Sequence, residues 1–306
     1  MDGGRTQLAP TIAAIVCTHA RPDYLAACLA GLKAQLGPRP DVIVVDSASP
    51  PEAAARIAAL AAGYGATLLR AEKPGLSLAR NLGLAQVRTD WVAYLDDDTV
   101  AEPDWAGRLV GAIAKLPPGA AAVGGRILPR WEAPLPQWWP ASLRGVLTIV
   151  EWEGQGEAGQ DLPDGVAVYG ANMAFRVDAL KTIGGFPVCL GRIGRRLLSG
   201  EEVEVLERLQ ASGYRIFYEG TAAVWHSIQQ ERLMPEWLLS RLHWQGATDA
   251  VRDRRRGRAR RAPGALAKLI LQAPLLLWPR GSSRLLRARC GAQYNLGYLR
   301  GTLVGG

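Results

Sequence analysis

The stretch Trp91-Val92-Ala93-Tyr94-Leu95-Asp96-Asp97-Asp98-Thr99 is the part of this sequence from which the fold can be worked out. An apolar run with strand character ends abruptly in three adjacent carboxylates. Ligands of open α/β sheets bind outside the carboxyl ends of the strands, so we expect the acids at a binding edge. Three neighbouring anions repel one another, and a divalent cation, which prefers carboxylate oxygens, would offset that repulsion. The alternative is a solvated acidic turn that only ends the strand.

The sequence around this stretch alternates between apolar strands and helices. Expected strands cover residues 11–17, 42–45, 67–69 and 91–96, and expected helices cover 24–35, 51–62, 76–86 and 103–116. Strands that are apolar throughout predict a parallel sheet with helices on both faces. Thr18, Asp46 and the Asp triplet follow three of these strands, so we expect them to meet at one edge, where the ligand binds.

The second half of the chain is expected to be less regular. Residues 129–165 are rich in Pro, Gly and Trp, which is typical of a long functional loop region with short strands. Strand patterns at 166–176, 214–218 and 222–225 and helical patterns at 177–183 and 201–212 follow.

The charge of the 306-residue chain is unevenly distributed around a net value of +8. Residues 229–306 hold 15 Lys and Arg against 4 Asp and Glu, whereas the part before them is slightly acidic. Such asymmetry indicates a separate surface role for the C-terminal part. The four cysteines lie far apart, which fits neither a zinc site nor a disulfide framework and favours a reducing compartment. Residues 1–10 show no apolar core of a signal peptide.

The turn after the first expected strand, Thr18-His19-Ala20-Arg21-Pro22, contains no glycine. A dinucleotide-binding Rossmann unit needs a Gly-rich turn at this place, and a Walker phosphate loop is also absent. A nucleotide would therefore have to be held in another way. A nucleotidyltransferase on a similar sheet is a rival interpretation, but it would need a Gly-rich loop with Arg and Lys here.

Eight short motifs occur in order between residues 12 and 227. They are Val16-Cys17-Thr18-His19-Ala20-Arg21, Val44-Val45-Asp46-Ser47-Ala48-Ser49, Ala79-Arg80-Asn81-Leu82-Gly83, Leu95-Asp96-Asp97-Asp98, Gly170-Ala171-Asn172-Met173-Ala174-Phe175-Arg176, Gly184-Gly185-Phe186, Gly200-Glu201-Glu202-Val203-Glu204 and Gly213-Tyr214-Arg215-Ile216. Together they resemble family 2 glycosyltransferases, in particular bacterial membrane-associated enzymes of polysaccharide and glycan synthesis. The resemblance implies a GT-A fold, which is a Rossmann-like mixed α/β sheet flanked by helices.

The resemblance also implies an inverting hexosyltransferase that moves a sugar from a nucleotide-diphosphate donor, UDP-linked, to a hydroxyl acceptor. The implied donor-binding residues are Thr18, Arg21, Asp46, Arg80, Asp96, Gly170, Ala171 and Asn172. Asp46 would accept the imide N–H of uracil, although Ser47 stands where the family often has a second acid. Arg80 would contact the diphosphate, because its planar fork suits bidentate phosphate binding.

In the family, the Asp triplet holds Mn²⁺ or Mg²⁺. Asp98 would be the direct ligand and Asp96 would contact the ribose or the metal, while Asp97 would point the other way because strand side chains alternate. His226 matches a position at which some relatives supply a third metal ligand, and a structural histidine is the alternative.

Glu201 and Glu202 match the acid pair that supplies the general base of the family. Inversion needs a carboxylate on the face opposite the leaving diphosphate, where it takes the proton of the acceptor hydroxyl. Glu202 occupies the usual base position, which is more often Asp, so Glu201 stays a candidate. Helix N-terminal acids that favour the macrodipole are the structural alternative. Trp138, Trp139 and Trp152 would stack on an acceptor sugar, rest at a membrane interface, or simply pack.

The domain organisation that we expect is an N-terminal segment at 1–10, a catalytic domain at 11–228 and a basic amphipathic helical extension at 229–306. In the extension, the basic run 252–261 precedes the apolar run 265–278, an order that suits an anionic membrane surface better than nucleic acid. The apolar run is shorter than the roughly 20 residues that span a membrane, and Pro274 interrupts it.

We therefore expect an interfacial or re-entrant anchor, a cytoplasmic protein at the inner face of the membrane, and a glycan or lipid-linked acceptor. Three alternatives stay open at this point: a solvated basic helix beside a core-packing helix, a non-catalytic nucleic-acid-binding protein, and a sugar-binding relative without activity.

Overall fold

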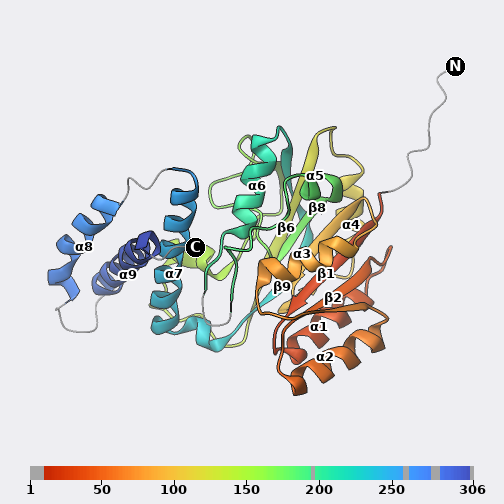
Figure 1. Ribbon diagram of the computed structural model, residues 1–306, viewed down its shortest axis with the longest axis horizontal. Coiled ribbons are helices and arrows are strands. Elements are labelled where there is room, and N and C mark those ends of the chain that lie inside the picture. The colour runs from red at the N-terminus through yellow and green to blue at the C-terminus, as the bar shows by residue number, and fades with distance from the viewer. Residues whose placement is uncertain (1–9, 194–196, 258–261, 277–282, 304–306) are drawn as a thin grey trace.

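The computed structural model describes residues 10–193, 197–257, 262–276 and 283–303. Within these ranges the centre of the molecule is a nine-stranded mixed sheet (Figure 1). Its strands are β1 Ile12–Thr18, β2 Asp41–Ser47, β3 Thr67–Ala71, β4 Trp91–Asp96, β5 Thr99–Ala101, β6 Ala120–Trp131, β7 Gln155–Glu157, β8 Asn172–Arg176 and β9 Arg215–Ile228. The expected segment 1–10, except Pro10, lies outside the described residues, as do 258–261 of the basic run and 277–278 of the apolar run.

The helices surround this sheet and extend beyond it at the C-terminal end. They are α1 Pro22–Lys33, α2 Pro51–Tyr64, α3 Leu76–Gln86, α4 Trp105–Ile113, α5 Val177–Thr182, α6 Glu201–Ala211, α7 Pro235–Arg255, α8 Ala262–Leu276 and α9 Ser283–Leu303, with 3₁₀ segments η1 Ala141–Leu147 and η2 Gln230–Leu233.

The strand order β3-β2-β1-β4-β8-β6-β9-β5 divides the sheet into two halves. The first four strands are parallel, as their continuous apolar sequences predict. β8 runs antiparallel to both β4 and β6, and β5 and β7 run antiparallel to β9. The sheet is therefore mixed, as the resemblance implied: β1 to β4 are parallel, and in the second half of the sheet β6 and β9 also pair in parallel.

Alternating side chains of the strands divide the core into two layers. Ile12, Ala14 and Val16 pack with residues of α1, α2 and α4 on one face. Ala13 and Ile15 pack with residues of α3, α5 and α6 on the other face. Because both faces are covered by helices, the carboxyl ends of β1, β2 and β4 form the edge at which a ligand can approach.

The region around β6 and β9 differs most from the sequence expectation. β6 begins at Ala120, where no strand was predicted, and β9 is one continuous strand where two were expected. The pair Gly124-Gly125 hid the strand signal, since glycine is uncommon in strand interiors. The structure requires glycine at 125 because a Cβ there would overlap Asn172 Nδ2 and Ala222 O.

The C-terminal helices pack tightly on one another. A Cβ at Gly246 of α7 would overlap Tyr294 O of α9, and a Cβ at Gly297 of α9 would overlap His243 O, so the two backbones lie in direct contact. Figure 1 shows α7 between the sheet and the α8–α9 pair. None of the helices in the described ranges combines the length and the hydropathy that a membrane crossing requires.

Candidate active site

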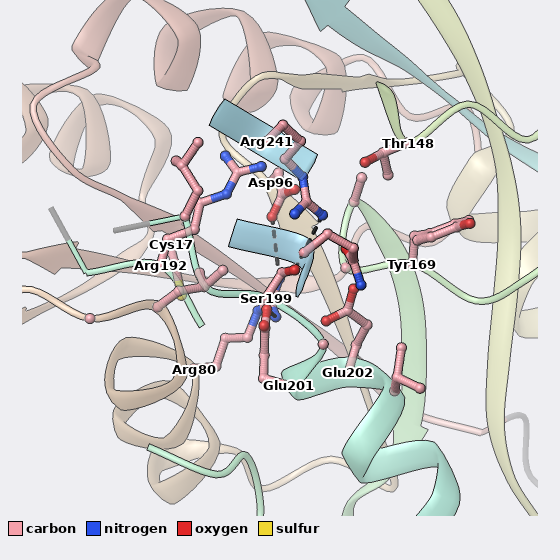
Figure 2. Close-up of a pocket in the computed structure, with 18 of the residues that line it drawn as sticks. Cys17, Arg80, Asp96, Thr148, Tyr169, Arg192, Ser199, Glu201, Glu202 and Arg241 are labelled. Atoms are coloured by element: carbon pink, nitrogen blue, oxygen red, sulfur yellow. Dashed lines mark hydrogen bonds and ion pairs between the residues drawn. The ribbon is translucent and has the colours of Figure 1, made fainter. Parts of the chain in front are cut away.

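A cavity of about 550 Å³ opens where β1 and β4 end. Figure 2 shows that side chains from α3, the start of α6 and α7 close it. Of the residues expected to act, it brings together Thr18, Arg21, Arg80, Asp96, Gly170, Ala171, Glu201 and Glu202. Segments that are up to 184 residues apart in sequence, from Thr18 to Glu202, thus meet at the edge that the strand order predicts.

The backbone beside this cavity adopts conformations that ordinary residues avoid. Ala20, Ala48 and Thr148 have φ values of 54°, 58° and 60°. Ala20 and Ala48 follow β1 and β2, and Thr148 itself lines the cavity. Such left-handed conformations at non-glycine residues persist where the surroundings hold them, and they cluster at functional sites.

Arg80 is the buried centre of the polar network in the cavity. Its Nη1 donates to Glu201 Oε1 at 2.7 Å and its Nη2 lies 3.3 Å from Asp96 Oδ1 (Figure 2). Arg80 is 3% exposed in its side chain, whereas Asp96 is 32% exposed and faces the cavity. Gly170 leaves room for this arginine, because a Cβ there would overlap Arg80 Nη2.

Glu201 and Glu202 are the first two residues of α6, where the macrodipole favours negative charge. Their environments differ. Glu201 Oε1 is paired with Arg80, whereas Glu202 has no ion-pair partner within the described part of the chain. Oε2 of each acid is buried and has no hydrogen-bond partner among the described residues. Burial, with Glu201 as a neighbouring anion, raises the pKa of Glu202 to about 7. Of the two acids, Glu202 is therefore the one free to exchange a proton near neutral pH.

Asp97 is fully buried and faces the end of β1 and the turn that follows it. Its carboxylate accepts a hydrogen bond from Thr18 Oγ1 at 2.7 Å and pairs with Arg21. Burial raises the pKa of Asp97 to about 7, although Arg21 acts in the opposite direction. Asp97 thus joins β4 to the turn after β1, and it points away from the cavity.

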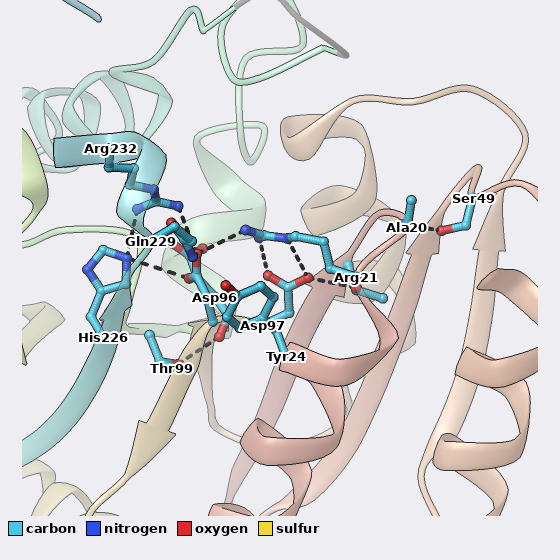
Figure 3. Close-up of polar contacts among 12 residues, drawn as sticks. Ala20, Arg21, Tyr24, Ser49, Asp96, Asp97, Thr99, His226, Gln229 and Arg232 are labelled. Atoms are coloured by element: carbon cyan, nitrogen blue, oxygen red, sulfur yellow. Dashed lines mark hydrogen bonds and ion pairs between the residues drawn. The ribbon is translucent and has the colours of Figure 1, made fainter. Parts of the chain in front are cut away.

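Asp98, the expected metal ligand, is held by cationic and amide side chains. Figure 3 shows Arg21, Gln229 and Arg232, which supply these contacts. Its Oδ2 accepts from Arg232 Nη2 at 2.8 Å, from Arg21 Nη1 at 3.0 Å and from Gln229 Nε2 at 3.2 Å. Burial alone would raise the pKa of Asp98, but the charges of Arg232 and Arg21 outweigh it and hold the pKa well below its ordinary value. Asp98 is therefore ionised.

His226 lies beside this carboxylate, with its Nε2 3.6 Å from Asp98 Oδ1. Arg232 Nη1 is 3.1 Å from the same Nε2, and because arginine only donates, the ring nitrogen accepts. Burial lowers the pKa of His226, so the ring is neutral with its proton on Nδ1. In this arrangement the Nε2 lone pair accepts a hydrogen bond from Arg232.

A divalent cation fits two carboxylates of the triplet. Asp98 Oδ1 is buried and lacks a hydrogen-bond partner among the described residues, and Asp96 is open to the cavity. Mg²⁺ and similar ions are commonly bound by one or two carboxylates together with substrate phosphates. No cluster of three or more His, Cys, Asp or Glu ligands occurs in the part of the chain that the structure describes. The donor set therefore suits a cation that arrives with a phosphate-bearing ligand.

Asp46 does not line the cavity, and both of its oxygens have partners. Oδ1 accepts from the Ser49 amide at 2.9 Å, and Oδ2 pairs with Arg70, which is half exposed. A nucleobase that forms a hydrogen bond with Asp46 Oδ2 would have to displace Arg70.

The remaining expected residues have structural contacts. Asn172 donates to Arg126 O and Ala222 O and accepts from Trp105 Nε1, so its amide joins β6, β8 and β9. Trp139 is buried in the cluster that connects η1 with α7 and α9, and Trp138 packs against the same cluster. Trp152 stacks on Tyr218 with ring centroids 5.4 Å apart. None of these four residues is among those that line the cavity in the described part of the chain.

Several lining residues were not predicted from the sequence. They include His19, Ser47, Gly75, Thr148, Tyr169, Arg192, Ser199, Arg241, Gln245 and Arg252. Arg241, Gln245 and Arg252 belong to α7, which we assigned to a separate extension. Their spacing of four and seven residues places them on one face of a helix, but this signal does not say which surface that face meets.

This sheet, with an acidic strand end facing a helix that begins with a carboxylate pair, defines a GT-A glycosyltransferase fold. The chain belongs to glycosyl transferase family 2, whose model matches residues 13–184. This membership favours the glycosyltransferase interpretation over the nucleotidyltransferase and nucleic-acid-binding alternatives.

Two of the curated relatives that the chain matches are glycosyltransferases by name. The chain is 33% identical to a glucosyl-dolichyl phosphate glucuronosyltransferase of Haloferax volcanii over 60% of this chain and 57% of that protein. It is 30% identical to a pre-mycofactocin glycosyltransferase of Mycobacterium tuberculosis over 66% of this chain and 39% of that protein. The matches thus span about half the length of these relatives.

A solved structure has the same fold. It is a mannosyltransferase from Pyrobaculum calidifontis in complex with GDP-Man and Mn²⁺. The match covers 97% of this chain and 88% of that chain with a TM-score of 0.61 and 18% identity.

Proposed function

We propose that this chain is an inverting glycosyltransferase that moves a sugar from a UDP-linked donor to an acceptor hydroxyl with the help of Mn²⁺ or Mg²⁺. The observation that carries the proposal is the position of Glu202. A carboxylate with a raised pKa lies in the same cavity as the Arg80–Asp96 pair at the sheet edge. A base and an anion-binding group that share one cavity are the two elements that an inverting displacement requires.

In the proposed reaction, Glu202 takes the proton of the acceptor hydroxyl while the oxygen attacks the anomeric carbon and the bond to the diphosphate oxygen breaks. A pKa near 7 suits this step, because the base is partly ionised at neutral pH and still binds a proton well. Arg80 would contact the leaving diphosphate, and Gly170 and Ala171 would lie under the donor sugar. A cation held by Asp96 and Asp98 would neutralise charge on the diphosphate.

The relatives support a nucleotide-sugar donor and a lipid-linked acceptor, without deciding between UDP and GDP. The Haloferax protein is named for a lipid-linked phosphate acceptor, and the Pyrobaculum structure contains a nucleotide sugar and Mn²⁺. We propose a nucleotide-sugar donor and a glycan or lipid-linked acceptor for this chain as well. We keep the division into a catalytic part at 11–228 and an extension at 229–306, with the addition that α7 of the extension supplies part of the cavity wall.

The test is a screen of UDP- and GDP-linked sugars with Mn²⁺, Mg²⁺ or excess chelator. Release of nucleoside diphosphate and the thermal midpoint of unfolding are both recorded, since a ligand that binds only the folded state raises that midpoint. We expect a UDP-sugar to give both signals only with a metal. Full turnover in chelator would contradict the proposed metal dependence. A response to GDP-sugars alone would contradict the proposed uracil nucleobase.

We also propose that the extension binds the inner face of the cytoplasmic membrane. Leu266, Ile270 and Leu271 of α8 are exposed, at spacings that place them on one side of the helix. No acidic residue occurs between 262 and 306, so the net charge of this stretch is positive. An apolar helix face with basic surroundings is typical of proteins that lie in an anionic interface.

Flotation with vesicles tests this location. The protein should bind vesicles that contain phosphatidylglycerol more strongly than pure phosphatidylcholine vesicles, and I270E/L271E should abolish binding. Leu36→Glu is the matched control, because Leu36 is 82% exposed, as Leu271 is 76% exposed, but it lies at the end of the chain opposite to the extension. Equal loss in both variants, or salt-sensitive RNA binding in place of vesicle binding, would contradict the proposal.

A further inference from the structure

Two arginines of the cavity have no carboxylate at ion-pair distance in the part of the chain that the structure describes. Arg80 pairs with Glu201 and Asp96, Arg21 with Asp97 and Asp98, and Arg252 with Glu207 at 2.9 Å. Arg192 and Arg241 also line the cavity, and within the described residues neither has an acidic group at ion-pair distance. Among the described residues, the cavity thus holds two cations without an ion pair, of which Arg192 is exposed to solvent. Glu202 and Asp249 act on Arg241 only from beyond ion-pair distance.

The surroundings of Arg241 make this arrangement costly without a ligand. Its Nη2 donates to Ser199 Oγ at 3.2 Å, while Nη1 is buried without a hydrogen-bond partner among the described residues. Burial lowers the pKa of Arg241, and Arg192 lowers it further by like-charge repulsion. An unpaired buried cation next to a second cation is unfavourable unless an anion binds between or beside them.

The position of Arg241 separates this arginine from the groups that would hold the donor. Arg241 belongs to α7, on the wall that also contains Leu242 and Gln245, whereas Arg80 belongs to α3 and Asp96 ends β4. Arg241 also contributes to the electrostatic environment of Glu202. In an inverting displacement the base and the leaving diphosphate lie on opposite sides of the anomeric carbon. Arg241, on the side of the base, therefore faces the acceptor, an assignment that rests on the proposed role of Glu202. Arg192, whose carbonyl accepts from Leu76 N at the start of α3, is the second cation that acts on Arg241 from across the cavity.

We propose that Arg241 and Arg192 bind a phosphate group of the acceptor, so that the enzyme recognises a phosphate-bearing sugar or alcohol. Two guanidinium groups match the geometry of phosphate oxygens, and arginine stays protonated, and so charged, at neutral pH. Both residues are drawn around the cavity in Figure 2, together with Glu202. A lipid-linked glycosyl phosphate and a free sugar phosphate share this chemistry.

The experiment compares acceptors that differ only in the phosphate. An octyl hexoside, the corresponding octyl hexosyl phosphate and the free hexose 1-phosphate are offered to the wild type, to R241Q and to R192Q. Arg108→Gln, a change at an exposed arginine of α4, is the control. Removal of an unpaired buried cation is not expected to destabilise the fold, so R241Q should remain suitable for assay.

We expect kcat/KM for the two phosphorylated acceptors to fall at least about tenfold in R241Q and R192Q, which is the loss of one charge-assisted hydrogen bond. Because loss of Arg241 also raises the pKa of Glu202, the acceptors are compared at about pH 9, where the base is ionised in each variant. There, transfer to the octyl hexoside and the donor affinity should stay close to the wild-type values. A preference between the octyl hexosyl phosphate and the hexose 1-phosphate tells whether the phosphate comes from a lipid or a free sugar phosphate. Equal losses with all acceptors, or weaker donor binding, would overturn the proposal because the arginines would then serve the donor.

Binding of inorganic phosphate to the UDP-saturated protein, measured by calorimetry, gives a readout that does not depend on turnover. The wild type should bind phosphate and R241Q should bind it at least about tenfold more weakly. Equal affinity in both would overturn the site. If the wild type uses no nucleotide sugar at all, the proposed function fails, whereas the phosphate measurement still decides whether the arginines form an anion site.

Discussion

Arg80 and Glu201 form a buried ion pair of 2.7 Å although 121 residues separate them in the sequence. The pair joins α3 to the start of α6 and holds the guanidinium at the sheet edge. Because Glu201 is used in this way, the adjacent Glu202 is left as the acid that can accept a proton. The sequence left both acids open as the base, and the ion pair is the reason to prefer Glu202.

The pair predicts that Glu201→Gln acts on donor binding. Arg80 would lose its closest ionic partner, so we expect affinity for the nucleotide sugar to fall roughly tenfold and stability to fall by about 1–3 kcal/mol. Isothermal titration and urea unfolding measure the two effects. Glu204→Gln on the same helix is the control, since Glu204 pairs with Arg208 at 3.1 Å and does not line the cavity. Normal affinity in Glu201→Gln would contradict this role.

The raised pKa of Glu202 predicts the pH dependence of turnover. The base must be ionised, so kcat/KM should increase with pH and level off above about 7. Glu201 contributes to the raised pKa as a neighbouring anion, so Glu201→Gln should move the midpoint of the profile to lower pH. The profile is measured with one acceptor under saturating donor. A midpoint that stays unchanged in Glu201→Gln would assign the titration to another group, such as Asp97.

The pair of Asp98 and Arg232 predicts a large stability effect. Both side chains are buried, and Arg21 shares the same carboxylate. Asp98→Asn would leave two guanidinium groups without their shared anion, so the free energy of unfolding should fall by about 3–5 kcal/mol. Arg232→Gln in that background should restore part of the loss, and a double-mutant cycle in urea measures the coupling. Additive effects would show that the pair contributes no stability.

Trp139 is predicted to act through packing. Its side chain fills the cluster between η1, α7 and α9, so Trp139→Ala should cost about 3–5 kcal/mol of stability. The KM for the acceptor should stay the same, since Trp139 does not line the cavity. Trp225→Ala, at a tryptophan that is 39% exposed, is the control. A raised KM with unchanged stability would restore the acceptor role that the sequence suggested.

The sequence predicted the elements whose signal is local. The helix at 76–86 has the bounds that were expected, and β1, β2 and β4 lie within one or two residues of theirs. β6 was missed because Gly124 and Gly125 interrupt its apolar pattern, although the structure needs glycine there for close packing. The acids at the strand ends were also predicted, because each directly follows a local apolar run.

The partners of those acids could not be predicted. Asp98 looked like a free ligand because nothing near it in sequence is basic, and its partner Arg232 lies 134 residues away on η2. Arg241 looked like one of many charges in a basic extension, and only the packing of α7 places it in the cavity. Pairings between distant segments depend on tertiary structure, which leaves no periodic signal in the sequence.

The most direct test of the central claim is the behaviour of Glu202→Gln. In the wild type, the folded-state pKa of Glu202 lies above the ordinary value of 4.5. The contribution of Glu202 to stability is therefore full below pH 4.5 and is lost as the pH rises through about 7. The amide removes that loss, and at pH 8 the variant should unfold at no lower temperature than the wild type.

The measurement is the rate of sugar transfer by Glu202→Gln at pH 8, together with its affinity for the UDP-sugar. We predict a rate that is lower by a factor of about 10² to 10⁴ and an unchanged donor affinity. A Glu202→Gln enzyme that transfers sugar at the wild-type rate, while Glu201→Gln does not, would contradict the account.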